Sequence, residues 1–327
     1  MNKMAENFLE IKDLVIEYTS DESVVHAVNG VSLSLKKGQT LGLVGETGAG
    51  KTTIAKSIMR ILPDPPSRFV GGTITVDGTD IMSLHEREML KIRGNKIAMI
   101  FQDPMTALNP LMPVGKQILE VVQLHNDFSY KEAVQHTCNM LEMVGIPAVR
   151  SVEYPHQFSG GMKQRIVIAM ALACNPELLL ADEPTTALDV TVQAQVLEMI
   201  KDLQKKLDTS MLLITHDLGV VAETCDEVAV IYAGQIMECG SKEDLFLRTA
   251  HPYTLGLFGS LPKLDDDSKR LSPIKGLPPD PTKEIVGCAF APRCPRADEA
   301  CRKCSIELTE LSPGHLVRCI HSGKEES

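Results

Sequence analysis

The sequence predicts an α/β protein built on a mostly parallel sheet, and three observations support this. Buried strands are indicated by short apolar runs at 97–101, 178–182, 211–215 and 227–232. Helices are indicated by the segments 51–61, 190–207 and 217–224. The two kinds of segment alternate along the chain, which is typical of parallel strands joined by crossover helices.

Two further parts of the chain have a different pattern. The early part, 8–44, is rich in predicted strands, with alternating apolar positions at Val31, Leu33 and Leu35. The stretch between Gln102 and Ser159 is mainly helical and includes 114–125 and 130–144. No internal repeat is visible, so the chain carries one copy of this arrangement.

Composition narrows the class of protein. The chain has 327 residues, 43% of them hydrophobic, which is enough for a core and more than one typical domain. No apolar run reaches 18 residues, and the N-terminus MNKMAENFLE lacks the apolar core of a signal peptide. The net charge of −10, without a large basic cluster, argues against nucleic acid as the main partner.

The segment GETGAGKT at 45–52 matches the pattern of a phosphate-binding loop. It follows an apolar strand, 40–44, and precedes a helix, so phosphate would meet a helix N-terminus. Small residues let the backbone N–H groups point at phosphate, Lys51 reaches the β and γ oxygens, and the Thr52 hydroxyl ligates Mg²⁺.

Two acids close the apolar run LLLADE at 178–183. Asp182 at the strand end is a candidate ligand of Mg²⁺, through water, and Glu183 is the candidate base that aligns the attacking water. An Asp-Glu pair after a strand is commonly a solvated turn. Its combination with the glycine loop favours the catalytic interpretation.

A second helix N-terminus is predicted at Ser159-Gly160-Gly161, where the serine caps an apolar helix, 162–174. One chain needs only one phosphate cradle. A second anion site without its own lysine is therefore interpreted as closing over a nucleotide that another subunit holds.

This ordered set of motifs resembles the ATP-binding-cassette (ABC) family over roughly residues 8–250. The resemblance implies an ABC-type P-loop fold with an antiparallel β subdomain and a helical subdomain, and a dimer that holds two ATP molecules head to tail. It also implies roles for Glu183, His216 and Gln102 in catalysis, and for Thr52, Gln102 and Asp182 in binding Mg²⁺. The nucleotide-binding residues that it implies are Tyr18, Gly45, Glu46, Thr47, Gly48, Ala49, Gly50, Lys51, Thr52, Thr53, Ser159, Gly160, Gly161 and Asp189. Met162 and Lys163 stand where many signatures carry Gln or Arg.

The C-terminal part changes character after residue 260. A Pro-rich stretch, 261–285, indicates an extended linker, and five of the nine cysteines fall in the tail that follows. Clustered cysteines without a secretion signal favour a metal site over disulfides. Cys301 and Cys304 form the one close pair with zinc-type spacing.

The tail, with HPYT at 251–254 and GCAFAPRCP at 287–295, is similar to that of the oligopeptide/dipeptide importer ATPases. The resemblance implies a [4Fe–4S] cluster with the ligands Cys288, Cys294, Cys301 and Cys319. Zinc and merely packed thiols are the alternatives, and Cys304 is an extra thiol that leaves the ligand set open. The cysteines at 138, 174, 225 and 239 are interpreted as structural.

The expected function is that of the energy-coupling ATPase of a peptide importer, peripheral on the cytoplasmic face of the membrane. The expected partners are two transmembrane permease subunits, a related second ATPase and, indirectly, an extracytoplasmic binding protein. An importer of nickel or another small solute, and a soluble ABC ATPase acting on DNA or ribosomes, are alternatives. The expected domains are 1–260 for the cassette, with a helical subdomain at about 103–175, the linker 261–285 and the tail 286–327.

Overall fold

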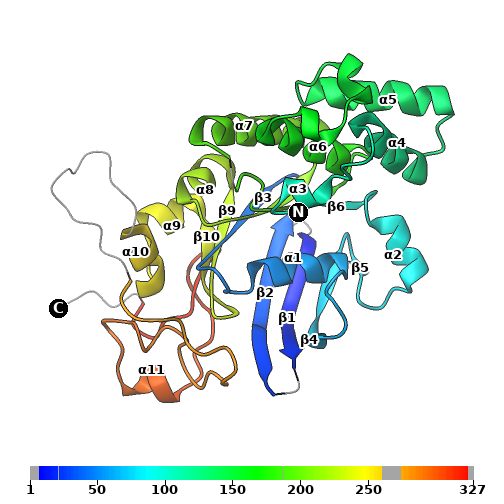
Figure 1. The fold of residues 1–327 in the computed structure, drawn as a ribbon. Coiled ribbons are helices and arrows are strands. Elements are labelled where there is room, and N and C mark those ends of the chain that lie inside the picture. Colours follow the sequence, from blue (N-terminus) through cyan, green and yellow to red (C-terminus); the bar gives the residue numbers. More distant parts are fainter. Residues whose placement is uncertain (1–6, 21, 187, 260–273, 323–327) are drawn as a thin grey trace, which may run out of the picture. The chain divides into compact units, whose positions relative to one another are not determined.

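The computed structural model describes residues 7–20, 22–186, 188–259 and 274–322, which form two compact units (Figure 1). The first unit comprises Lys36–Thr40 and Ser83–Ile214. The second comprises Asn7–Leu35, Leu41–Met82 and the described residues from Thr215 onward. Each unit combines strands with helices, so the predicted α/β class is confirmed.

Parallel strands form the core of the first unit, in the order β8, β7, β6. Their bounds are Ile97–Ile100 for β6, Leu178–Asp182 for β7 and Ser210–Thr215 for β8. Every residue of these strands is buried, as expected for parallel strands that are covered on both faces. The predicted strands are confirmed to within one residue at each end.

The first unit contains several helices among its described residues, and the last four begin and end within two residues of the predicted segments 114–125, 130–144, 162–174 and 190–207. The helices are α2 Glu86–Ile92, α3 Pro104–Ala107, α4 Val114–His125, α5 Tyr130–Met143, α6 Gly160–Leu172 and α7 Val190–Leu207, with 3-10 turns η1 Ala148–Val152 and η2 Pro155–Gln157. Side-chain caps fix several of the starts. At α5, Ser129 Oγ accepts from Glu132 N at 3.4 Å, and Ser129 N donates to Glu132 Oε2 at 2.8 Å. Figure 1 shows α4, α5 and α6 grouped together.

The second unit contains a separate sheet with the strand order β2, β1, β4, β5, whose pairs β1/β4 and β4/β5 are antiparallel. Its strands are β1 Asn7–Thr19, β2 Val24–Lys36, β4 Ser67–Val76 and β5 Thr79–Asp80. In β2, Val31, Leu33 and Leu35 are buried while Ser32 and Ser34 are exposed, which confirms the predicted alternation.

A second group of strands in this unit runs in the order β11, β12, β10, β9, β3. Only β3 and β9 form a parallel pair among the described pairings of this group, and the others are antiparallel. The strands are β3 Thr40–Val44, β9 Glu227–Tyr232, β10 Gln235–Ser241, β11 Thr309–Ser312 and β12 His315–Val317. All residues of β3 are buried, as the sequence predicts.

The helices of the second unit are α1 Lys51–Met59, α8 Leu218–Thr224, α9 Lys242–Leu247, α10 Pro252–Gly259 and α11 Glu299–Lys303. Helix α1 is two residues shorter than the predicted 51–61. It ends because Arg60 adopts a left-handed conformation, with φ of 50°, and its N–H caps the carbonyls of Lys56 and Ser57.

The C-terminal extension is attached to the sheet of the second unit. Strand β12 pairs antiparallel with β10, with Val317 opposite Glu238 and Leu316 opposite Cys239. Residues 261–273 of the predicted linker lie outside the described residues, and 274–285 contain neither helix nor strand. Over the described ranges, every helix is too short or too polar to span a bilayer.

Candidate functional site

The phosphate-binding loop, residues 45–52, links β3 to α1 in the second unit. Lys51 is only 7% exposed, and its Nζ donates to Gly45 O at 2.7 Å and to Glu46 O at 3.0 Å. The lysine thus spans the loop and holds two of its carbonyls. Thr52 lies in the first turn of α1.

Two glycines of this loop have no room for a side chain. A Cβ on Gly45 would lie 2.1 Å from Ile231 O, and one on Gly50 would lie 2.5 Å from Ala27 O. Gly50 also has φ of 102°, which L side chains rarely adopt. Both glycines of the motif are therefore required by the fold.

Two more predicted residues of the second unit have clear positions. The hydroxyl groups of Tyr18 and Thr53 are hydrogen-bonded at 3.3 Å, which puts the β1 tyrosine beside the first turn of α1. His216 is exposed in the turn between β8 and α8. Asp217, which follows it, caps α8 by accepting from Gly219 N and Val220 N.

The first unit brings Gln102 and Glu183 together. Gln102 Nε2 donates to Glu183 Oε2 at 2.9 Å, and Thr186 Oγ1 donates to the same oxygen at 2.9 Å. Glu183 has φ of 47°, and its N–H is bonded to Ile214 O, so the chain turns sharply at the end of β7. Asp182, the last residue of β7, is 3% exposed. Sequence reasoning missed Thr186, whose position three residues after Glu183 in a turn was the available signal.

The predicted signature segment forms the N-terminus of α6. Ser159 is the N-cap, and its Oγ accepts from Met162 N at 3.4 Å, which confirms the predicted serine cap. Ser159 and Gly160 are exposed. A Cβ on Gly161 would lie 2.5 Å from Val192 Cγ1 of α7, so glycine permits the close packing of α6 on α7.

Asp189 begins α7 in the same unit. Its carboxylate accepts from Val192 N at 3.0 Å as the N-cap of the helix. The negative side chain at a helix N-terminus is favourable. The structure thus gives Asp189 a capping contact within its own chain.

Four tail cysteines, Cys288, Cys294, Cys301 and Cys319, line one small cavity of the second unit. Burial raises the pKa of the first three thiols, and the charge of a neighbouring cysteine raises it further. Cys304 is exposed at the end of α11.

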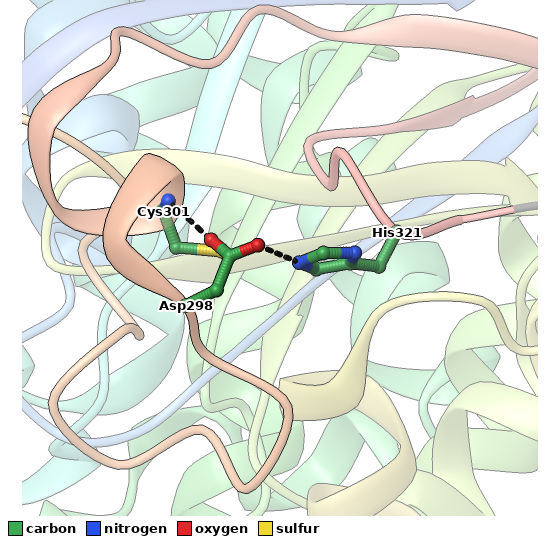
Figure 2. Close-up of side chains that lie close together, drawn as sticks. All are labelled: Asp298, Cys301 and His321. Carbon is green, nitrogen blue, oxygen red and sulfur yellow. Dashed lines mark hydrogen bonds and ion pairs between the residues drawn. The ribbon is translucent and has the colours of Figure 1, made fainter.

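Asp298 and His321 lie close to Cys301, as Figure 2 shows, and His321 also lines the cavity. Asp298 caps α11 by accepting from Cys301 N at 2.9 Å, and His321 Nε2 lies 3.1 Å from its other oxygen. The potential ligand atoms of Asp298, Cys301 and His321 lie within 4.8 Å of one another. This trio offers oxygen, sulfur and nitrogen donors to a metal ion.

A buried carboxylate joins the segment before α10 to strand β12 of the tail. Glu238 of β10 is 0% exposed, and it accepts from Ala250 N at 2.8 Å, His251 N at 3.0 Å and His315 Nε2 at 2.9 Å. All three donors are satisfied by one side chain. Glu238 therefore fixes the start of α10 and strand β12 together.

The phosphate-binding loop, the acid-terminated strand and the capped glycine signature are, on this α/β fold, the parts of an ATP-binding cassette. The comparisons agree. The family model described as "ABC transporter" matches residues 28–186. A second model, "Oligopeptide/dipeptide transporter, C-terminal region", matches residues 237–301.

Similar proteins extend over almost the whole chain. The "Probable peptide ABC transporter ATP-binding protein y4tR" of Sinorhizobium fredii is 49% identical over 99% of this chain and 97% of its own. The "Dipeptide transport ATP-binding protein DppD" of Bacillus subtilis is 49% identical over 96% and 94%. The "Oligopeptide transport ATP-binding protein OppD" of Escherichia coli is 45% identical over 99% and 96%.

Solved structures support the same class. A dimeric post-hydrolysis structure of the ATP-binding cassette MJ0796, bound to ADP and Pi, matches 71% of this chain and 98% of its own, with 26% identity and a TM-score of 0.64. The cbiO1 structure from Clostridium perfringens matches 75% and 92%, with 25% identity and a TM-score of 0.64. The chain belongs to the ABC transporter family, in the oligopeptide/dipeptide branch of its ATP-binding proteins, and it is an ATPase.

Proposed function

We propose that this chain is the ATP-hydrolysing subunit that powers an ABC importer of di- and oligopeptides. The observation that supports this proposal most strongly is the near full-length similarity to ATP-binding proteins named for peptide transport. The C-terminal region takes part in this similarity. Glu238 of β10 forms hydrogen bonds with His251, before the linker, and with His315 in the tail. The tail is therefore an integral part of the second unit, which supports this proposal.

ATP would bind with its phosphates at residues 45–53 and its adenine against Tyr18. Lys51, which spans the loop, would exchange its two carbonyl contacts for phosphate oxygens. Thr52, Asp182 and Gln102 offer hard oxygen donors, which suit Mg²⁺. The ion, when bound, would offset the charge that develops on the phosphates.

Glu183 would act as the base that orients the attacking water. Its Oε2 already accepts from Gln102 and Thr186, and these two contacts fix the direction of the carboxylate. His216, exposed after β8, would contact the γ-phosphate. Phosphoryl transfer depends mostly on positioning and electrostatics, which such fixed groups supply.

The exposed N-terminus of α6 would bind the γ-phosphate of a nucleotide on a second, related ATPase subunit. Ser159, Gly160 and Gly161 carry no lysine of their own, which suits a site that completes another one. Asp189 would link the two sites. ATP binding would then close the dimer, and hydrolysis would reopen it.

The helical part at about 103–175 would face two transmembrane permease subunits at the cytoplasmic face of the membrane, and an extracytoplasmic binding protein would deliver the substrate. The domains proposed from the sequence fit this arrangement: the cassette, 1–260, a linker, 261–285, and the tail, 286–327. Exposed apolar side chains on the helical part favour a protein partner there. They are Leu111, Leu124, Val149 and Val152.

The cysteine cavity would hold a [4Fe–4S] cluster. The four cysteines that line it are the same four that the resemblance implies, and Cys304 is exposed. Four thiolates are suitable ligands for an iron–sulfur cluster. The cluster would act as a structural cross-link between the segments that carry the cysteines. Zinc is the second candidate, because Asp298 and His321 lie close to Cys301.

The test is uptake of a labelled dipeptide into proteoliposomes that contain this chain, the proposed permeases and the proposed second ATPase, with the binding protein outside. We expect uptake that requires ATP inside and is reduced by unlabelled oligopeptides. Uptake of Ni²⁺ in place of peptide would contradict the proposal. Purification without oxygen, followed by absorbance near 400 nm and metal analysis, decides between iron–sulfur and zinc.

A further inference from the structure

Glu46 of the phosphate-binding loop makes two contacts with the C-terminal part of the chain, all within the second unit. Arg293 Nη1 donates to Glu46 Oε2 at 2.8 Å, and Glu46 N donates to Tyr253 Oη at 3.0 Å. The loop residue is thus held at both its side chain and its backbone. The side-chain contact uses a carboxylate to which the proposed chemistry gives no role, whereas Glu46 N is a backbone N–H of the phosphate-binding loop.

Arg293 is fixed along its whole length. Its side chain is 6% exposed, and its Nη1 also donates to Tyr232 Oη at 3.1 Å. Its other nitrogens donate to Lys275 O at 3.1 Å and to Ile274 O at 3.3 Å. A desolvated arginine with this many partners is rigid, and the position of Glu46 therefore depends on the backbone that carries Arg293.

That backbone lies between two residues that line the cysteine cavity, Ala291 and Cys294. Arg293 directly precedes Cys294, and its N–H donates to Phe290 O at 2.9 Å within the turn that begins at Cys288. Cys288 and Cys294, at the two ends of this turn, both line the cavity. A group bound by both sulfurs would hold the turn, and with it Arg293, in one position.

The second contact leads to the same cavity. Tyr253 N donates to His251 Nδ1 at 3.0 Å, and His251 is a buried lining residue. The ring of Tyr253 also packs on that of Phe290, with centroids 5.3 Å apart. The two supports of Glu46 are therefore anchored in one wall and move with it.

We propose that the cysteine cavity is coupled to the phosphate-binding loop through Arg293 and Tyr253, so that filling the cavity strengthens nucleotide binding. Arg293 is a positioning residue, because it touches Glu46 and not the phosphates. This inference rests on the proposed function, which places a metal or cluster at the cysteines and ATP at the loop. It assigns the tail a task in the ATPase cycle that does not require electron transfer.

The first test measures binding of a fluorescent ATP analogue to the full chain after anaerobic loading with iron and sulfide, and separately with Zn²⁺. Arg293→Met is expected to weaken binding about tenfold, the usual scale for losing a hydrogen bond to a charged group. Within the assembled transporter it should raise KM for ATP and leave kcat unchanged. Arg302→Met, which removes an exposed arginine of α11, is the matched control and should bind like the wild type.

A double-mutant cycle tests whether Arg293 acts through Glu46. Glu46→Gln and the double variant are measured beside Arg293→Met. If the pair acts as a unit, the double variant binds no more weakly than the weaker single variant. If the double variant loses affinity by the product of the two single-variant factors, Arg293 does not act through Glu46 and the proposed route is wrong.

The second test needs no substitution. Depleting the loaded wild-type chain with a chelator should weaken nucleotide binding and speed deuterium exchange of the amides at 45–50. Arg293→Met should lose less affinity on depletion than the wild type, because only the Tyr253 contact still joins the cavity to Glu46. Unchanged affinity and exchange would overturn the coupling, even in a chain that still binds and hydrolyses ATP. If neither iron with sulfide nor Zn²⁺ loads the chain, the proposed occupant and this inference both fail, and the ATPase proposal stands.

Discussion

Gln102 Nε2 donates to Glu183 Oε2 at 2.9 Å, which joins residues 81 positions apart in the first unit. Thr186 Oγ1 donates to the same oxygen, so both contacts involve Oε2 and neither involves Oε1. The carboxylate is held in a defined direction by neutral donors. A base that aligns and deprotonates the attacking water depends first on this kind of positioning.

Replacing Glu183 by Gln should leave ATP affinity unchanged and lower the rate of hydrolysis by about 100-fold or more, because the amide cannot accept a proton. The closed ATP-bound dimer should then accumulate. Steady-state hydrolysis and size-exclusion chromatography with ATP measure the two effects. Hydrolysis at the wild-type rate would remove Glu183 from the mechanism.

Replacing Gly45 by Ala should distort the phosphate-binding loop, because the new Cβ would lie 2.1 Å from the backbone oxygen of Ile231. Relief of that overlap costs about 1–3 kcal/mol, seen as weaker binding of the fluorescent ATP analogue. Gly48→Ala is the comparison, since its Cβ meets no atom within 4 Å although its φ is +81°. If both variants lose the same affinity for the ATP analogue, backbone strain and not the steric overlap causes the loss.

The sequence predicted local structure well where local chemistry decides it. The segments 190–207 and 114–125 became α7 and α4 with the predicted bounds, because their apolar spacing is local and Asp189, directly before α7, caps that helix. The cap at Ser159 was predicted for the same reason. These features need no knowledge of distant parts of the chain.

The contacts that could not be predicted join distant segments. Arg293 and Glu46 are 247 positions apart, and Glu238 and His315 are 77 apart. Both pairs depend on how the tail packs, including the pairing of β12 with β10. A short strand such as β12, with three residues, carries too little periodicity to reveal its partner.

Replacing Glu238 by Ala should lower the stability of the chain by an amount on the order of 3 kcal/mol, since three buried donors lose their acceptor. The urea midpoint of the full chain measures this effect. Glu284→Ala removes an exposed carboxylate of the linker and serves as the control, with no expected change. A midpoint for Glu238→Ala equal to that of the control would contradict the anchoring role.

The buried Cys225 should resist alkylation. Burial raises the pKa of its thiol to about 12, so almost none of it is thiolate at pH 8, and the thiolate is the reactive form. Raising the pH toward 12 increases the thiolate fraction and should increase labelling in proportion while the fold persists. Mass spectrometry after brief treatment with iodoacetamide should find exposed Cys304 modified first. Early labelling of Cys225 in the folded chain would contradict its burial.

The most direct measurement of the central claim records ATP hydrolysis and dipeptide uptake together in proteoliposomes that contain the assembled transporter. The wild-type chain should show both, each dependent on Mg²⁺, and Glu183→Gln should show neither while it still binds ATP. Peptide uptake that continues without hydrolysis, or hydrolysis that survives the substitution, would contradict the account.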